Sequence, residues 1–211
     1  MNADQLIRAP AADPPEGARL NQSIALIAGI GVAAAVALFF IRIGLRPNLA
    51  TAIHDPRVML KFLAPFSAAV ATAGLLLRVI RPGMARGWWS VALFTPLGLL
   101  AIGAIGELSV YPASEWYARL VGRYSSYCLK SIPLLAAPIL VALLFALRRG
   151  TPMRPSLAGA LAGLLAGTIG ATIYAAHCPD DSPLFLMTWY GLSVAMVTLA
   201  GALLGARMLR W

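Results

Sequence analysis

Long apolar stretches separated by short polar segments make up almost the whole chain. Six of these stretches reach the roughly 20 residues that a helix needs to cross a hydrocarbon layer of about 30 Å. They are Ser23–Leu45, Val58–Ile80, Trp88–Tyr111, Tyr127–Leu147, Ser156–Ala176 and Leu184–Ala206. Because strands with unpaired backbone groups are excluded from lipid, the pattern predicts an all-α polytopic membrane protein. We expect a tail at residues 1–22 and a six-helix transmembrane domain at residues 23–211.

Composition supports this prediction and excludes a soluble domain. Of the 211 residues, 60% are apolar and 12% are charged, whereas soluble domains average roughly 45–50% and about 25%. The net charge of +9 is a feature of many nucleic-acid-binding proteins, but it also fits basic loops that face a membrane. The positions of the charges decide between the two interpretations.

The basic residues predict that both chain ends lie in the cytoplasm. With six spans the two ends share one side, and the larger group of Lys and Arg residues lies there: Arg8, Arg19, Arg78, Arg81, Arg86, Arg148, Arg149, Arg154, Arg207 and Arg210. The smaller group lies opposite: Arg42, Arg46, Arg57, Lys61, Arg119, Arg123 and Lys130. Beyond the tail, every acidic residue also falls on that opposite, outer side. The inner loops are therefore purely basic, and direct nucleic-acid binding is not needed to explain the charge.

The spans contain little that a transporter or an enzyme needs. Their middle thirds carry no ionisable residue, although proton and ion paths use such groups. We find no nucleophile elbow, P-loop or HExxH motif, so we do not expect an enzyme. A small six-span transporter or channel-like protein remains the alternative function. Glycines at four-residue spacing predict close helix packing between the fifth and sixth spans: Gly159, Gly163, Gly167, Gly201 and Gly205.

The N-terminal tail is the first candidate site. Leu6 and Ile7 are apolar residues in an otherwise polar stretch, and Asn2 and Gln5 resemble a helix capping pair. The tail has too little apolar surface to fold alone, so it either folds on a partner or is a solvated leader.

The two cysteines are the second candidate site. Cys128 begins the fourth span and Cys178 follows the fifth, so with six spans both lie on the outer side. In a bacterium that side is oxidising, and a reversible disulfide is available there. His177, Cys178, Asp180 and Asp181 also predict a site for a soft or borderline metal ion, to which His54 and Cys128 are possible additions. The alternative is two unrelated cysteines near span ends.

These segments together resemble the NrsF family of six-span bacterial anti-sigma factors. The resemblance rests on Asp4–Ala9 (DQLIRA), Gly44–Leu49 (GLRPNL), Leu147–Gly150 (LRRG), and His177–Phe185 (HCPDDSPLF) followed by Trp189 and Tyr190. It implies a protein of the bacterial inner membrane that sequesters an extracytoplasmic-function sigma factor. The tail would bind the sigma factor through Asp4, Leu6 and Ile7, where Pro10 stands in place of an expected leucine.

The resemblance also implies a sensor. Paired cysteines in the family are associated with oxidants or heavy metals, which assigns this role to Cys128 and Cys178. The expected partners are the sigma factor and the lipid bilayer, without direct contact to nucleic acid. No cofactor is expected apart from a transient heavy-metal ion at the cysteines.

Overall fold

The computed structural model describes residues 16–79, 87–149, 152 and 154–209, with side chains from residue 22 onward. These residues form helices and loops and contain no strand. The six long helices are α2 (Glu16–Arg42), α4 (Pro56–Val79), α6 (Thr95–Val110), α8 (Ser125–Leu147), α9 (Pro155–Ala175) and α11 (Gly191–Met208). The short ones are α3 (Leu49–Ala52), α5 (Trp89–Ala92), α7 (Ala113–Val121), α10 (Pro183–Phe185) and the π-helical turn η2 (Leu186–Tyr190).

Six segments of the described chain are long and apolar enough to cross a membrane, which confirms the predicted number and the all-α class. They are Gln22–Arg42, Pro56–Val79, Trp89–Val110, Ala113–Leu147, Pro155–Ala175 and Pro183–Met208. The boundaries differ where local chemistry intervenes. Helix α2 already begins at Glu16 rather than at Ser23, and the third span consists of α5 and α6. The break precedes Pro96, which occupies the first turn of α6, where proline is favoured.

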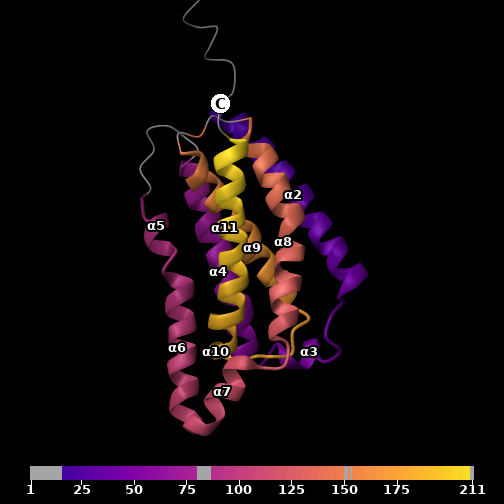
Figure 1. Ribbon diagram of the computed structural model, residues 1–211, viewed down its shortest axis with the longest axis vertical. Coiled ribbons are helices and arrows are strands. Elements are labelled where there is room, and N and C mark those ends of the chain that lie inside the picture. The colour runs from indigo at the N-terminus through magenta and orange to yellow at the C-terminus, as the bar shows by residue number, and fades with distance from the viewer. Residues whose placement is uncertain (1–15, 80–86, 150–151, 153, 210–211) are drawn as a thin grey trace, which may run out of the picture.

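The helices form one bundle with α9 at its centre. Helix α9 packs against α11, α8 and α4, whereas α2 packs mainly on α8 and α6 mainly on α4. In Figure 1, α2 and α6 accordingly lie at opposite edges of the bundle. The predicted glycine contact is confirmed: a Cβ at Gly205 would lie 2.6 Å from Gly159 Cα, so the two backbones touch. Only small residues permit this approach.

The two ends of the bundle differ in character. We call the end that holds α3, α7, α10 and the loop of residues 176–182 the thiol end, and the end where α2 begins and α11 finishes the terminal end (Figure 1). The described acidic side chains all lie at the thiol end: Asp55, Glu107, Glu115, Asp180 and Asp181. The functional candidates of the described chain therefore gather at one end.

Candidate functional site

The thiol end encloses both cysteines in one buried cluster. Cys128 lies in the first turn of α8 and Cys178 in the loop after α9, and each is 0% exposed. Both pack in the same apolar cluster, and the Cys178 thiol donates to the Asp180 carbonyl oxygen at 3.9 Å. Both are free thiols. The structure thus brings together the two residues that the sequence analysis paired.

A buried lysine holds the loop that carries Cys178. Lys61 extends from α4, is 0% exposed, and uses all three ammonium protons. It donates to the carbonyl oxygens of Cys178 at 2.6 Å and Asp180 at 2.7 Å, and to Asp181 Oδ1 at 2.9 Å. An ammonium is costly to bury unless such partners compensate for the lost water. Lys61 therefore fixes the backbone on both sides of Pro179.

Arg46 binds the same loop through the same two residues, Cys178 and Asp181. Its Nη1 donates to both carboxylate oxygens of Asp181 at 3.0 Å and to the Cys178 carbonyl oxygen at 3.3 Å. Arg46 is 8% exposed, so this ion pair is largely shielded from solvent. Lys61 and Arg46, with Asp181 between them, form what we call the cation clamp. The clamp ties the loop to α4 and to the segment that follows α2.

Asp180 joins the loop to the beginning of α8. Its Oδ2 accepts hydrogen bonds from the backbone N–H groups of Arg123 at 2.9 Å and Tyr124 at 2.8 Å. Gly122, with φ +59°, makes this possible, because a Cβ there would lie 2.8 Å from the same carboxylate oxygen. The loop with Cys178 and the helix with Cys128 are thereby linked through Asp180.

The predicted metal ligands do not converge. Asp180 binds backbone amides and Asp181 belongs to the cation clamp. His177 Nδ1 lies 3.0 Å from the Gly44 carbonyl oxygen, which can only accept, so this nitrogen carries the proton. In the part of the chain that the structure describes, no three His, Cys, Asp or Glu side chains are placed to hold a metal ion. In this structure His177, Asp180 and Asp181 have other partners, and the four-residue metal set stays a prediction.

Two tyrosine hydroxyls lie buried beside the thiols. Tyr174 is 0% exposed and Tyr190 is 5% exposed, and neither hydroxyl has a hydrogen-bond partner among the described residues. Both rings pack in the cluster that contains the cysteines. Their neighbours are the two thiols, so the four side chains form one buried, weakly polar group.

The surroundings of Cys178 favour its thiolate. The neighbouring Cys128 thiol and, to a smaller extent, the positive charge of Lys61 lower the pKa of Cys178 below that of an ordinary thiol, although burial acts in the opposite direction. Because the thiolate rather than the thiol attacks oxidants and disulfides, this environment makes Cys178 the more reactive member of the pair.

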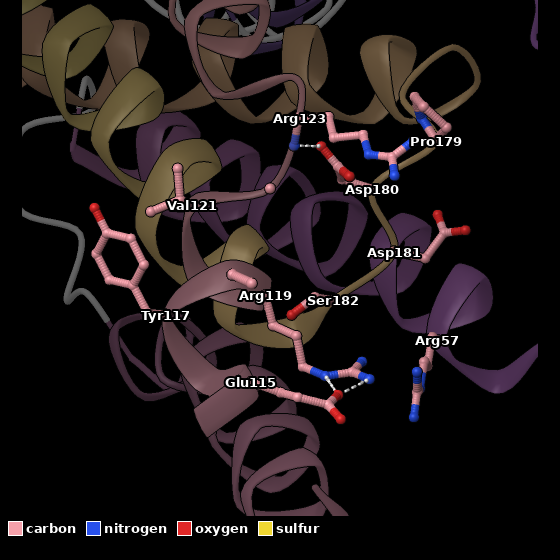
Figure 2. A pocket seen from close by; sticks show the side chains of 12 residues that line it. Arg57, Glu115, Tyr117, Arg119, Val121, Arg123, Pro179, Asp180, Asp181 and Ser182 are labelled. Atoms are coloured by element: carbon pink, nitrogen blue, oxygen red, sulfur yellow. Dashed lines mark hydrogen bonds and ion pairs between the residues drawn. The ribbon is translucent and has the colours of Figure 1, made fainter. Parts of the chain in front are cut away.

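A second ionic network covers the solvent side of the loop. Glu107, 3% exposed on α6, accepts from Ser182 Oγ at 2.6 Å and pairs with Arg119 of α7 at 3.3 Å. Figure 2 shows Arg119 also paired with Glu115, beside an open polar pocket of about 750 Å³. Neither cysteine lines this pocket. The loop and its charged residues thus separate the thiols from the pocket.

Some of these residues were not recognised as site residues from the sequence. Lys61 and Arg46 were counted only as outer-side charges, although a lysine inside a predicted span is a recognisable signal. Glu107 was counted only among the acidic residues of the outer side. Asp4, Leu6 and Ile7, the predicted sigma contacts, lie outside the described residues.

Comparisons with known proteins place the chain in a family. The family model described as negative regulator of sigma F matches residues 9–211. The chain is 36% identical to the anti-sigma-F factor NrsF of Caulobacter vibrioides, over the full length of both proteins. No solved structure matches. The resemblance noted in the sequence is confirmed: this chain belongs to the NrsF family of negative regulators of sigma F.

Proposed function

We propose that this protein is a membrane anti-sigma factor that releases its sigma factor when Cys128 and Cys178 join in a disulfide. The partner is a sigma factor of the extracytoplasmic-function class, held by the N-terminal tail at the cytoplasmic face of the inner membrane. The observation that carries the proposal is the meeting of two cysteines, distant in sequence, as free thiols in one buried cluster. This arrangement suits a reversible bond rather than a permanent structural one.

The packing of α8 supports a route from the thiols to the tail. Cys128 lies at the thiol end of α8, and α8 is the main neighbour of α2, the helix that follows the tail. The contact is close at Gly31 of α2, where a Cβ would lie 2.8 Å from Ala142 Cβ and 3.1 Å from the Pro138 carbonyl oxygen. Because the two helices are in direct contact here and protein interiors are close-packed, a movement of α8 also moves α2.

Disulfide formation supplies the displacement. The two sulfur atoms must approach to about 2.05 Å, well inside their non-bonded contact. The cation clamp holds the Cys178 side, so the first turns of α8 move toward the loop. Pro133 and Pro138 interrupt the hydrogen-bond ladder of α8 and are natural bending points. A tenfold loss of sigma affinity requires only about 1.4 kcal/mol of differential binding.

A thiophilic metal ion is a second possible signal at the same pair. Two thiolates are suitable ligands for a soft ion, and bridging them would also draw α8 toward the loop. His177, Asp180 and Asp181 of the predicted metal set bind other groups of the protein. The preference of the site for one metal ion over another would therefore depend on the two sulfur ligands alone. The transporter alternative receives no comparable support, because the buried Lys61 and Glu107 of the described spans lie at the thiol end and not at midspan.

Single cysteine variants test the sensor. We expect Cys128→Ser and Cys178→Ser each to abolish oxidant-dependent sigma release, because one thiol cannot form the bond. The chain contains only these two cysteines, so no other pair can substitute for them. Release is measured as sigma factor lost from membranes after oxidant treatment, with Ser131→Ala as the control near Cys128. A serine variant that responds like the wild type would refute the paired-thiol mechanism.

A second set of variants tests the tail. Changing Leu6 and Ile7 together to alanine is expected to reduce sigma co-purification at least tenfold, because the apolar contact surface is lost. The neighbouring polar change Gln5→Ala is the control and should retain the sigma factor. Membrane insertion is measured in parallel. Full retention of the sigma factor by an inserted Leu6→Ala/Ile7→Ala protein would contradict a tail-based contact.

A further inference from the structure

We propose that Tyr174 and Tyr190 set the oxidation threshold of the thiol pair. Their buried hydroxyls donate to the cysteine sulfurs in the reduced protein and lose these acceptors when the disulfide forms. Both tyrosines are positioning residues, which act through the thiols and are not themselves oxidised. Their part in sigma release rests on the proposed function, whereas their effect on the thiols requires no sigma factor.

Both hydroxyls lie inside the protein beside the sulfur atoms. Tyr174 of α9 is next to Cys128, and Tyr190 of η2 is next to Cys178. The centroids of the two tyrosine rings are 6.0 Å apart, so the rings approach the thiols together. Tyr174 is 0% exposed and Tyr190 is 5% exposed. Bulk water is therefore not available to these hydroxyls, and the sulfur atoms are the neighbours that can accept from them.

The backbone holds the four side chains together. The Cys178 N–H group donates to the Tyr174 carbonyl oxygen at 3.2 Å, in the turn that ends α9. Ser193, three residues after Tyr190, is 0% exposed and donates to the Cys128 carbonyl oxygen at 3.3 Å. This hydrogen bond joins the beginning of α11 to the first turn of α8. The positions of the hydroxyls relative to the sulfurs are thus fixed by three helices.

The other polar groups around Cys178 already have partners. The three ammonium protons of Lys61 go to the carbonyl oxygens of Cys178 and Asp180 and to the Asp181 carboxylate. The Cys178 thiol donates to the Asp180 carbonyl oxygen, which leaves the lone pairs of its sulfur free to accept. The two tyrosine hydroxyls have no hydrogen-bond partner in the described part of the chain. They therefore have protons that can be donated to sulfur.

Oxidation removes the acceptors of these protons. Each thiol gives up one proton and one electron, and the two sulfurs join. When the oxidant is a small cyclic disulfide, it takes up both protons and both electrons and becomes a dithiol. A thiolate accepts a charge-assisted hydrogen bond, whereas a neutral disulfide sulfur is a weak acceptor. Because a buried hydroxyl without an acceptor costs free energy, the two hydroxyls favour the reduced pair.

A redox titration of the purified full-length protein in detergent tests the proposal without a sigma factor. The protein is equilibrated, from the reduced and from the oxidised side, with mixtures of dithiothreitol and its cyclic disulfide. Mass spectrometry measures the fraction of protein disulfide. We expect Tyr190→Phe, which keeps the ring and removes the hydroxyl, to shift the equilibrium about tenfold toward the disulfide, or about 30 mV for this two-electron couple. Tyr174→Phe should shift it in the same direction.

An exposed tyrosine provides the matched control. Tyr127 precedes Cys128 in the chain but is 61% exposed, so Tyr127→Phe should leave the equilibrium unchanged. A tyrosine that only fills space stabilises the reduced and the oxidised protein equally, and its hydroxyl can be removed without moving the equilibrium. The proposal is overturned if Tyr190→Phe and Tyr174→Phe titrate like the wild type, or if either shifts toward the dithiol.

The same titration separates this proposal from the proposed function. Unshifted tyrosine variants of a wild type that does form the disulfide overturn the role of the hydroxyls alone. A wild-type protein that forms no disulfide at any ratio overturns the paired-thiol sensor as well. Each tyrosine variant is titrated separately, so the failure of one to fold leaves the other to decide.

Discussion

Replacing Lys61 by methionine is expected to lower the free energy of unfolding by about 3–5 kcal/mol, as for other broken buried ion pairs. The substitution keeps the apolar volume but removes the ammonium that donates to Cys178, Asp180 and Asp181. The carbonyl oxygens of Cys178 and Asp180 then lose a charged hydrogen-bond donor. Of the two ion pairs of Asp181 in the described chain, the one with Arg46 is kept. The loss is measured as the shift of the unfolding transition of the purified protein in detergent.

An exposed lysine provides the matched control. Lys130 lies on α8 close to Cys128 and is exposed, so Lys130→Met should change the unfolding free energy by less than about 0.5 kcal/mol. The loop loosened by Lys61→Met should also expose Cys178, so a charged thiol reagent should label that variant faster than the wild type. A Lys61→Met protein with wild-type stability and wild-type labelling would show that the clamp does not hold the loop.

Gly201→Ala is expected to destabilise the bundle by about 1–3 kcal/mol, the usual cost of overpacking. A Cβ at Gly201 would lie 2.8 Å from Gly163 Cα and 2.9 Å from Gly163 N, and it would also meet the Gly159 carbonyl oxygen. These are backbone atoms, which cannot move aside as a side chain can. Helices α9 and α11 must therefore separate, and the unfolding transition in detergent should occur at lower denaturant.

The same helix contains the control for this effect. Gly191 begins α11, and a Cβ there would meet nothing within 4 Å. Gly191→Ala should therefore leave stability unchanged or raise it by up to about 1 kcal/mol through helix propensity. Equal stability of the Gly201→Ala and Gly191→Ala proteins would contradict the close crossing of α9 and α11.

The sequence is sufficient for the number of spans because a helix in lipid must be long, apolar and internally hydrogen-bonded. It is less informative about their ends. Helix α2 continues outward to Glu16, since polar residues can extend a helix into water. The π-helical turn at Tyr190 has no periodicity signal, because it depends on the packing of α10 and α11 around the cysteine cluster.

The site was predictable only in part for a related reason. Counting spans places both cysteines on one side, and a four-residue glycine spacing marks the contact of α9 with α11. By contrast, the partners of Asp180 and Asp181 are a backbone turn and two distant cations, and nothing local in HCPDDSPLF distinguishes these partners from a metal ion. Likewise, the burial of Lys61 and Tyr190 follows from how α4 and η2 meet the loop, which is a tertiary property.

The coupling of the thiol pair to the sigma factor is tested most directly on the purified complex of the two proteins. The complex is titrated with oxidant, and the fraction of Cys128–Cys178 disulfide is measured by mass spectrometry on the samples in which bound sigma factor is quantified. We predict that release rises in proportion to the disulfide and that a thiol reductant restores binding. A sigma factor that stays bound with the disulfide fully formed, or leaves while both thiols are free, would contradict the account.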